Sequence, residues 1–335
     1  MYKIIEEGKA KIKVPVEKKI SRELPVFYNP VMKFNRTVSV LLLRVLGKKK
    51  MRIALPLGGT GVRAVRFLKE LPKSMIEKLI INDADKEAVK IIKENLKLNK
   101  VKCEVFNEEA NKFMILSEGF DYIDIDPFGS PNLFLDSAMK RIGRDGVLAV
   151  TATDTGCLAG SYPKACLRKY WAKPLRNENM HENGLRILIR KVQLIGADHG
   201  KALIPIYSYF KDHYFRVFFR CEKGKQKVDK LLKEHGMIGE VGPLWKGELW
   251  DKKIASDVAK LTDDKFLKVI ADESKINSVG FYHIPKFAKK NKLKMIKQDE
   301  LIKKIKKKGY KVALTHFAPN SIRSDIEENK LIKLF

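Results

Sequence analysis

The sequence predicts an α/β fold, in which a mostly parallel sheet with helices on both faces closes with an antiparallel hairpin. Patterns typical of strands and of helices alternate along the chain to about residue 200. The hairpin is predicted from the aromatic-rich run K-A-L-I-P-I-Y-S-Y-F-K-D-H-Y-F-R-V-F-F-R at 201–220. After Arg220 the composition becomes charged, which indicates a smaller α+β domain. We therefore expect one domain at 1–221 and a second at 222–335.

The charge of the chain favours a polyanionic partner. Its 335 residues include 68 lysines and arginines against 40 acidic residues, a formal net charge of +28. Nucleic acid and an anionic membrane surface both attract such a protein. A lysine-rich thermophilic surface explains part of the excess, but thermophilic enrichment tends to add charges of both signs.

Other composition signals narrow the class of protein. The sequence contains no apolar run of about 18 residues, so we expect no membrane span. The N-terminus has no apolar core typical of a secretory signal. Its 4 cysteines lie far apart, without a C-x-x-C pair. Buried free thiols, no zinc site and a cytoplasmic location are therefore expected.

A glycine turn follows the first strand of the predicted sheet. M-R-I-A-L-P-L leads into Gly58, Gly59 and Gly61, after which a helical pattern begins. Such a turn lets the backbone approach a ligand, and a helix N-terminus favours anionic groups. Many such turns carry glycine only for packing. The spacing is not G-x-G-x-x-G, which argues against a dinucleotide site.

Acidic residues end the next two predicted strands. Asp83 lies about 20 residues beyond the glycine turn, where a carboxylate can bind ribose hydroxyls. Asp85 qualifies as well, or caps the following helix. The third strand ends in Glu108, Glu109 and Ala110, where an acid could accept a hydrogen bond from an adenine amine. Ordinary surface charge is the alternative for either glutamate.

The fourth strand ends on a carboxylate, in the stretch F-D-Y-I-D-I-D-P-F-G-S-P at 120–131. A buried strand that ends in Asp126 needs an explanation, because desolvating a charge is costly. Pro127 keeps the preceding backbone extended, and Phe128 adds an aromatic face. This combination suits a planar ring with an amino group, and it predicts a site for methyl transfer to a nucleic-acid base.

Several motifs, found along nearly the whole chain, resemble those of the archaeal and eukaryotic tRNA guanine-26 N2-dimethyltransferase family. They are F-Y-N-P-V-M-K-F-N-R, G-T-G-V-R-A-V-R-F, N-D-A-D-K-E-A-V, D-P-F-G-S-P-N-L-F-L-D-S-A, T-A-T-D-T, P-K-A-C-L-R-K-Y, G-P-L-W-K-G and T-H-F-A-P. The resemblance implies a Rossmann-like class I methyltransferase domain followed by a tRNA-docking domain. It implies S-adenosylmethionine as methyl donor and tRNA as substrate and partner, and it implies no protein partner. Some relatives carry paired zinc-binding cysteines, but this chain lacks that pattern, so we expect no metal.

The resemblance also assigns roles to cofactor-binding residues. Arg36 and Arg66 would contact the cofactor, Arg36 at its carboxylate, and Asp83 would hold the ribose. Glu109 with Ala110 would contact the adenine. Many class I methyltransferases carry an acid before the glycine turn, but here the segment reads L-P-L. That departure raises the importance of Arg36.

The expected chemistry concerns the N2 amine of guanine. We expect Asp126 to accept one N2–H hydrogen bond and the Pro127 carbonyl another, which orients the lone pair. Phe128 would stack on the base, and Phe27 would close its other side. An ordinary alternative for Phe27 is an aromatic staple at the entry of the helix that follows.

Two alternative functions are compatible with the same residues. One is an amino-methyltransferase for a DNA base or another RNA guanine, since the chemistry at D-P-F-G is shared. The other is a non-catalytic RNA-binding protein with the same fold. A nicotinamide dehydrogenase is disfavoured, because the sequence contains no evident Tyr-Lys or histidine-based hydride site.

Overall fold

The computed structural model describes residues 2–16 and 26–335. The chain forms two compact units. Unit 1 consists of Met1–Asp154, Val192–Ile204 and Arg216–Leu232, and unit 2 of Thr155–Lys191, Pro205–Phe215 and Lys233–Phe335. Each unit combines residues from both sides of position 221, and the division into domains at 1–221 and 222–335 stays a prediction.

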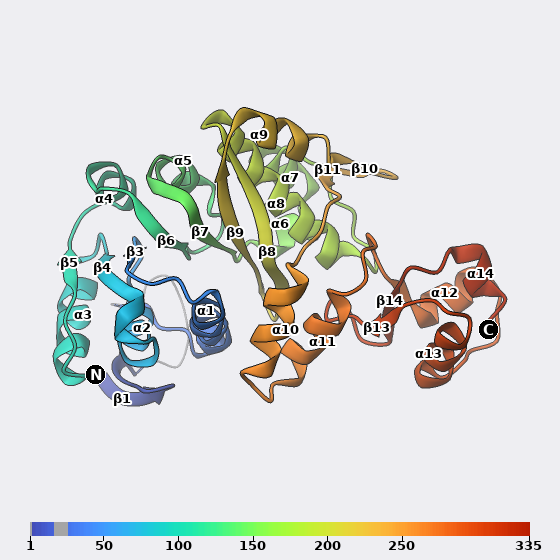
Figure 1. The fold of residues 1–335 in the computed structure, drawn as a ribbon, viewed down its shortest axis with the longest axis horizontal. Coiled ribbons are helices and arrows are strands. Elements are labelled where there is room, and N and C mark those ends of the chain that lie inside the picture. Colours follow the sequence, from blue (N-terminus) through green and yellow to red (C-terminus); the bar gives the residue numbers. More distant parts are fainter. Residues whose placement is uncertain (1, 17–25) are drawn as a thin grey trace. The chain divides into compact units, whose positions relative to one another are not determined.

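The main sheet has seven strands in the order β5-β4-β3-β6-β7-β9-β8 (Figure 1). The strands β3, β4, β5, β6 and β7 pair in parallel. The β8–β9 hairpin completes the order, so the predicted mostly parallel sheet with a terminal hairpin is confirmed. The bounds are β3 Met51–Leu55, β4 Ile76–Asn82, β5 Glu104–Phe106, β6 Phe120–Ile125, β7 Ile142–Ala152, β8 Lys201–Lys211 and β9 Tyr214–Lys223.

Helices connect the parallel strands, as their right-handed crossovers require. Helix α2 packs between α1 and α3, and α4 packs on α5; the two groups lie apart in Figure 1. Asp85 caps α3 by accepting a hydrogen bond from the Glu87 backbone nitrogen, which confirms its expected capping role. The bounds are α1 Lys33–Leu46, α2 Val62–Glu70, α3 Lys86–Leu98, α4 Ala110–Leu116, α5 Asn132–Arg141, α8 Met180–Asp198 and α9 Lys225–Leu232, with short 3-10 turns at Pro30–Met32 and Lys73–Met75.

The core of unit 1 lies along the central strands. Ile53, Ile81, Ile123 and Ile125 are fully buried. Burying a side chain of this size stabilises the fold by about 1.5–3 kcal/mol. The strands that end at the candidate site are therefore held rigidly.

A hairpin of β1 (Tyr2–Glu7) and β2 (Ala10–Pro15) precedes α1. Two side chains of α3 hold its backbone: Asn95 Oδ1 accepts from the Lys13 nitrogen at 2.7 Å, and Asn99 Oδ1 accepts from the Lys11 nitrogen at 2.9 Å. These bonds hold β2, and the pairing of Glu7 with Ala10 in turn holds the carboxyl end of β1.

Unit 2 combines short helices with two small sheets, as expected for an α+β domain. Among the helices are α11 and α12, and the side chains Ile284 and Phe287 of α12 join a buried apolar cluster. The bounds are α6 Thr155–Leu158, α7 Pro163–Tyr170, β10 His235–Ile238, β11 Val241–Trp245, α10 Lys252–Lys260, α11 Lys265–Glu273, β12 Tyr282–His283, α12 Ile284–Lys290, α13 Gln298–Lys307, β13 Val312–Leu314, β14 Ser321–Ser324 and α14 Glu328–Ile332.

Among the described residues, no helix combines the length and the apolar character needed to cross a bilayer.

Candidate active site

The candidate site lies where the order of the sheet reverses. After β5 the chain crosses β3 and continues with β6, and open α/β sheets bind their ligands at such a switch point. The loops 56–61, 83–85 and 126–131 follow β3, β4 and β6 at this edge. The sequence placed candidate site residues in these three loops and in a fourth, which follows β5 and carries Glu109 and Ala110.

The turn after β3 requires glycine for two reasons. A Cβ on Gly58 would lie 2.8 Å from Ile81 Cγ1 and 3.0 Å from the Asn82 carbonyl oxygen, so a side chain has no space there. Gly61 has φ 77°, which L side chains rarely adopt, and it directly precedes α2. The turn therefore brings bare backbone to the edge of the sheet.

Asp83 contacts this turn directly. Its Oδ2 accepts from the Gly59 nitrogen at 2.7 Å, and its Oδ1 accepts from the Asp85 nitrogen at 3.0 Å. Burial raises the pKa of Asp83, although backbone N–H groups counteract it. Each carboxylate oxygen has a second lone pair, which leaves capacity for ribose hydroxyls.

Glu109 acts as the cap of α4. Its carboxylate accepts from the Lys112 nitrogen at 2.9 Å and from Asn111 Nδ2 at 3.0 Å. Slight burial raises the pKa of Glu109, but these hydrogen bonds outweigh it and lower the pKa. Ala110 is buried at the first position of the helix. The expected contact of both residues with adenine stays a prediction.

Arg36 is buried against Glu7, a residue without a predicted role. Arg36 Nε donates to Glu7 Oε1 at 2.7 Å, and Nη2 donates to Glu7 Oε2 at 2.6 Å. Tyr28 also donates to Glu7, at 3.0 Å. Burial raises the pKa of Glu7, but Arg36 and Arg66 outweigh it and lower the pKa. Arg36 Nη1 has no hydrogen-bond partner in the described part of the chain, so this nitrogen is available for the cofactor carboxylate.

Arg66 has fewer donors left than Arg36. Its Nε and Nη2 donate to Glu70 at 2.7 and 3.0 Å, and its Nη1 donates to Glu7 at 3.1 Å and to Thr37 Oγ1 at 2.9 Å. Arg66 thus ties the β1 hairpin to α2. Its predicted contact with the cofactor stays a prediction, and it would have to share a nitrogen that is already bonded.

Asp126 directly follows the end of β6, as predicted. Its Oδ2 accepts from Arg63 Nη2 at 2.5 Å, and its side chain is 19% exposed. No described residue forms a hydrogen bond with its Oδ1 or with the Pro127 carbonyl. Asp126 therefore offers one held oxygen and one available oxygen.

The loop after Asp126 is tied to the segment that follows β7. The Gly129 nitrogen donates to Thr153 Oγ1 at 2.6 Å, and the Thr153 nitrogen donates to the Gly129 carbonyl at 2.9 Å. The two motifs D-P-F-G and T-A-T-D-T are thus joined by a pair of hydrogen bonds. This pairing fixes the position of Phe128.

Phe27 and Phe128 contact each other edge to face, with 4.1 Å between ring centroids and an interplanar angle of 70°. Rings in contact leave no space for a third ring between them. Phe128 is nevertheless 43% exposed, so part of its ring is accessible. A base held between the two rings, as expected from the sequence, requires them to separate.

A buried network behind Asp126 was not predicted from the sequence. Arg216 donates to both oxygens of Asp124 at 2.8 Å, and Arg63 Nη1 lies 3.2 Å from Asp124 Oδ2. Tyr122 also donates to Asp124, at 2.6 Å. Burial raises the pKa of Asp124, but the two arginines outweigh it and lower the pKa. Alternation along β6 was the available signal, since it places residues 122, 124 and 126 on one face.

The four cysteines, all among the described residues, are thiols and not disulfides; Cys157, Cys166 and Cys221 are buried, and Cys103 is partly buried. Within 2–16 and 26–335, no group of three or more His, Cys, Asp and Glu side chains could hold a metal ion.

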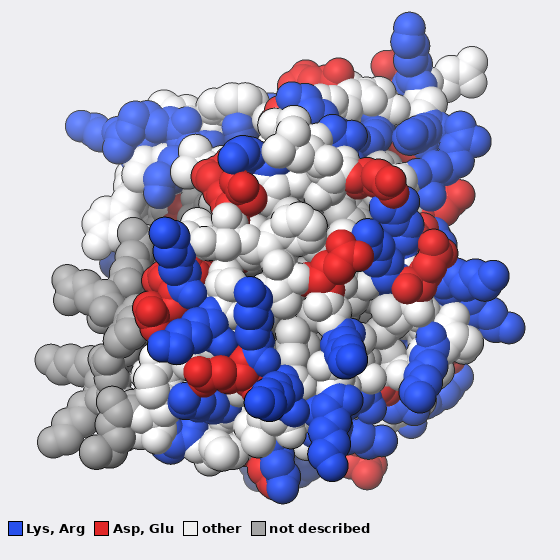
Figure 2. Space-filling view, turned by 90° about the vertical axis from the view of Figure 1, so that its left-hand side faces the viewer, with Lys and Arg blue, Asp and Glu red and all other residues white. Residues whose placement is uncertain are grey.

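The surface charge is distributed rather than gathered into one stripe on the side that carries α3. Figure 2 shows lysines and arginines there with acidic side chains interspersed. Lysines on the surface of unit 1 pair with neighbouring acidic side chains, as in Lys13–Glu94 at 2.7 Å and Lys78–Glu104 at 2.8 Å. Much of the surface charge is thus locally paired.

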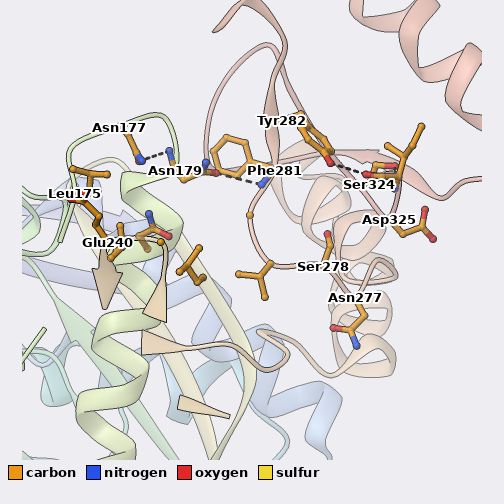
Figure 3. A pocket seen from close by; sticks show the side chains of 17 residues that line it. Leu175, Asn177, Asn179, Glu240, Asn277, Ser278, Phe281, Tyr282, Ser324 and Asp325 are labelled. Atoms are coloured by element: carbon orange, nitrogen blue, oxygen red, sulfur yellow. Dashed lines mark hydrogen bonds between the residues drawn. The ribbon is translucent and has the colours of Figure 1, made fainter. Parts of the chain in front are cut away.

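Unit 2 contains a separate hollow of about 560 Å³ (Figure 3). Asn177 Oδ1 accepts from the Asn179 nitrogen at 3.0 Å on one wall, and the Ser278 hydroxyl is buried without a partner among the described residues. The lining contains Glu240 and Asp325 but no lysine or arginine, which disfavours a phosphate. No predicted site residue lines it. The lining residues are Leu175, Asn177, Asn179, Asn183, Ile238–Val241, Asn277–Tyr282 and Ser324–Ile326.

Comparison with known sequences gives consistent matches. The model of the family described as N2,N2-dimethylguanosine tRNA methyltransferase matches residues 8–241 and 237–335. A tRNA (guanine(26)-N(2)/guanine(27)-N(2))-dimethyltransferase of Aquifex aeolicus (strain VF5) is 40% identical, over 98% of this chain and 95% of the relative. A tRNA (guanine(26)-N(2))-dimethyltransferase of Thermococcus kodakarensis is 36% identical, over 96% of this chain and 95% of the relative.

A solved structure shares the whole fold. It is the complex of Trm1 from Pyrococcus horikoshii with S-adenosyl-L-methionine, which is 34% identical in sequence. The TM-score is 0.89, and the alignment covers 99% of both chains. The likeness therefore extends over both units.

Proposed function

Because the chain belongs to the N2,N2-dimethylguanosine tRNA methyltransferase family, we propose that it methylates the exocyclic N2 of guanine 26 in tRNA, giving N2-methyl- and N2,N2-dimethylguanine. The observation that carries the proposal is the match over nearly the whole length of relatives named for this reaction. S-adenosylmethionine would supply the methyl group and leave as a neutral thioether. The cytoplasmic location expected from the sequence forms part of the proposal.

The cofactor-facing residues have the chemistry that this donor needs. The bare backbone at Gly58–Gly61 allows close approach, and Asp83 has lone pairs for two ribose hydroxyls. Arg36 Nη1 would receive the carboxylate of the donor's amino-acid end. Glu109 and Ala110 would lie at the adenine. These assignments rest on the family motifs together with the geometry of the loops.

Asp126 would act on the target amine. The N2 lone pair of guanine is delocalised into the ring, so the amine is a poor nucleophile. Asp126 Oδ1 would accept an N2–H hydrogen bond, which turns the lone pair toward the methyl group and stabilises the positive charge that develops on nitrogen. Once the N2–methyl bond has formed, the nitrogen is strongly acidic, and its proton leaves through Oδ1 to water.

Binding of the base requires two movements. Guanine must leave its stack in the tRNA, which costs a few kcal/mol. Phe27 and Phe128, which now touch, must separate if the base is to lie between them. Basic residues that bind tRNA phosphates would offset part of this cost.

A second target position is supported by one relative. The Aquifex aeolicus protein, 40% identical to this chain, is named for guanine 27 as well as guanine 26. Methylation at guanine 27 is therefore a second candidate activity of the same site.

The direct test is methylation of defined tRNA transcripts by the full chain. We expect mono- and dimethylated guanine at position 26 by mass spectrometry, and loss of the product when adenine replaces guanine 26. A parallel transcript with guanine 27 replaced tests the second position. The proposal would be contradicted if no transcript were methylated, or if methyl incorporation were unaffected by both replacements.

A further inference from the structure

We propose that Arg63 is a positioning residue that fixes Asp126 for the second of the two methyl transfers. The inference rests on the proposed function, since it concerns the ratio of its two products. Arg63 is the second residue of α2, directly after the glycine turn expected to hold the cofactor. It therefore links the turn at the end of β3 to the carboxylate at the end of β6.

The guanidinium of Arg63 is held by four contacts. Its Nη2 donates to Asp126 Oδ2 at 2.5 Å and to Asn35 Oδ1 at 2.9 Å. Its Nη1 donates to Ser39 Oγ at 2.8 Å and lies 3.2 Å from Asp124 Oδ2. Three of the five N–H donors of the guanidinium thus form hydrogen bonds, and with the added ion pair to Asp124 the plane of the group is fixed.

Two partners of Arg63, Ser39 and Asn35, are held by other groups as well. The Ser39 hydroxyl donates to the Asn35 carbonyl at 3.0 Å and accepts from Arg63 and from Arg216 Nη2, the latter at 3.0 Å. A hydroxyl has one proton and two lone pairs, so its capacity is filled. Asn35 Nδ2 donates to Thr151 Oγ1 at 3.2 Å. Because the Ser39 hydroxyl is filled and the Asn35 amide is held at both ends, rotation of Arg63 would leave buried polar atoms unpaired.

This network holds the carboxylate of Asp126 in one orientation. Oδ2 is held by Arg63, whereas Oδ1 has no bond from a described residue and is the oxygen left with both lone pairs for the substrate amine. Rotation of the carboxylate would break its bond to Arg63. The side chain is only 19% exposed, so water could replace that bond only in part. The acceptor is thus placed before the substrate arrives.

The two methyl transfers differ in how much they depend on that placement. A primary amine has two N–H groups, and either one can meet Oδ1. After the first transfer the amine has one N–H and one methyl group, and only the orientation with N–H toward Oδ1 is productive. In each transfer the N2–C bond forms, the S–C bond breaks, and one proton leaves N2. Loosening Asp126 should therefore slow the second transfer more than the first.

Arg63→Lys tests this directly. A lysine keeps the charge but cannot hold Asn35, Ser39 and Asp126 at once. At equal total methyl incorporation into tRNA, we expect the ratio of N2-methyl- to N2,N2-dimethylguanosine to rise about tenfold, the factor that corresponds to losing one charged hydrogen bond. Guanidinium ion added to Arg63→Ala should restore the ratio toward wild type.

The product ratio separates positioning from general damage. A fraction of misfolded enzyme lowers both transfers equally and leaves the ratio unchanged. Arg52→Lys is the matched control, because Arg52 pairs with Glu118 in the same unit and touches no site residue named here; its ratio should equal that of wild type. Asn35→Ala, which removes one bond to Arg63, should raise the ratio less than Arg63→Lys.

An unchanged ratio in both Arg63→Lys and Asn35→Ala, with wild type forming both products, would overturn the inference and leave the proposed function intact. If wild type forms no methylated guanine, the proposed function itself fails.

Discussion

Two buried arginine–carboxylate networks, one in each unit, differ in how they end. In unit 1, Arg216 and Arg63 hold Asp124, and the network ends at Asp126, which keeps one oxygen available. In unit 2, Arg323 lies between Glu182, at 2.7 Å, and Glu273, at 2.9 Å. Both glutamates and Arg323 have fully buried side chains.

The network of unit 2 is closed. Glu273 accepts from Thr315 at 2.5 Å and lies 2.6 Å from His316 Nδ1, while Glu182 is also held by Arg186. Its members come from α8, α11 and β14 and from the segment after β13, which it joins. Buried charges are tolerated when every partner is paired. A buried ion network by itself therefore does not mark an active site. The network of unit 1 differs in that it ends at a carboxylate with an available oxygen.

The largest change in stability is expected in the closed network. Glu182→Gln leaves Arg323 and Arg186 with too few negative partners in a buried site. Breaking such a pair costs about 3–5 kcal/mol of unfolding free energy, which denaturant titration measures. Glu178→Gln is the control, because Glu178 forms a surface pair with Lys286 at 3.4 Å, worth about 0–1 kcal/mol. Equal losses in the two variants would contradict the comparison.

The closed network should also make the unfolding free energy depend on pH. Burial raises the pKa of Glu273, but His316 and Arg323 outweigh it and lower the pKa to about 2. Ionised Glu273 therefore contributes its full stabilisation above the pKa of about 4.3 that a glutamate has in the unfolded chain. As the pH falls toward 2 this contribution to the unfolding free energy, about 3 kcal/mol, is lost. The difference in unfolding free energy between wild type and Glu273→Gln should shrink over this pH range. A constant difference would contradict the stabilising role of ionised Glu273.

The open site should affect binding more than stability. Asp83→Asn removes charge from the predicted ribose contact, and we expect S-adenosylmethionine affinity in calorimetry to fall about 10- to 100-fold. Because burial raises the pKa of Asp83, wild-type affinity should weaken on acidification at a higher pH than for an ordinary aspartate. Asp136→Asn is the control, because Asp136 forms a surface pair with Lys140 on α5 and has no predicted role in the site; its affinity should be unchanged. Unchanged affinity in Asp83→Asn would remove Asp83 from the site.

The smallest change in stability is expected at Phe128. Its ring is 43% exposed and meets Phe27 edge to face, so Phe128→Leu should cost about 1 kcal/mol or less. Loss of base stacking should nevertheless slow methyl transfer about tenfold. If the rate in a tritiated methyl-transfer assay is unchanged, Phe128 does not stack on the base.

Local sequence signals predicted the frame of the site. The glycine turn, Asp83 and Asp126 were placed at strand ends because strand and helix patterns are local properties of the chain. Glu109 was noted as an acid after a strand, and the structure adds its role as the cap of α4. These predictions depended on residues near each other in sequence.

Long-range partners could not be predicted in the same way. Glu7 meets Arg36 only because the β1 hairpin folds back on unit 1, and Arg216 reaches Asp124 from a strand 92 positions later. The contact of Phe27 with Phe128 likewise joins distant segments. Such pairings follow from tertiary packing, for which alternation along a single strand gives only a partial signal.

The central claim is that the available oxygen of Asp126 carries the reaction, and Asp126→Asn tests it most directly. With saturating S-adenosylmethionine and tRNA, we expect its rate of methyl transfer to fall by about 10²–10⁴-fold, since an amide oxygen is a weaker acceptor and cannot take the proton. A rate within about twofold of wild type would contradict the claim.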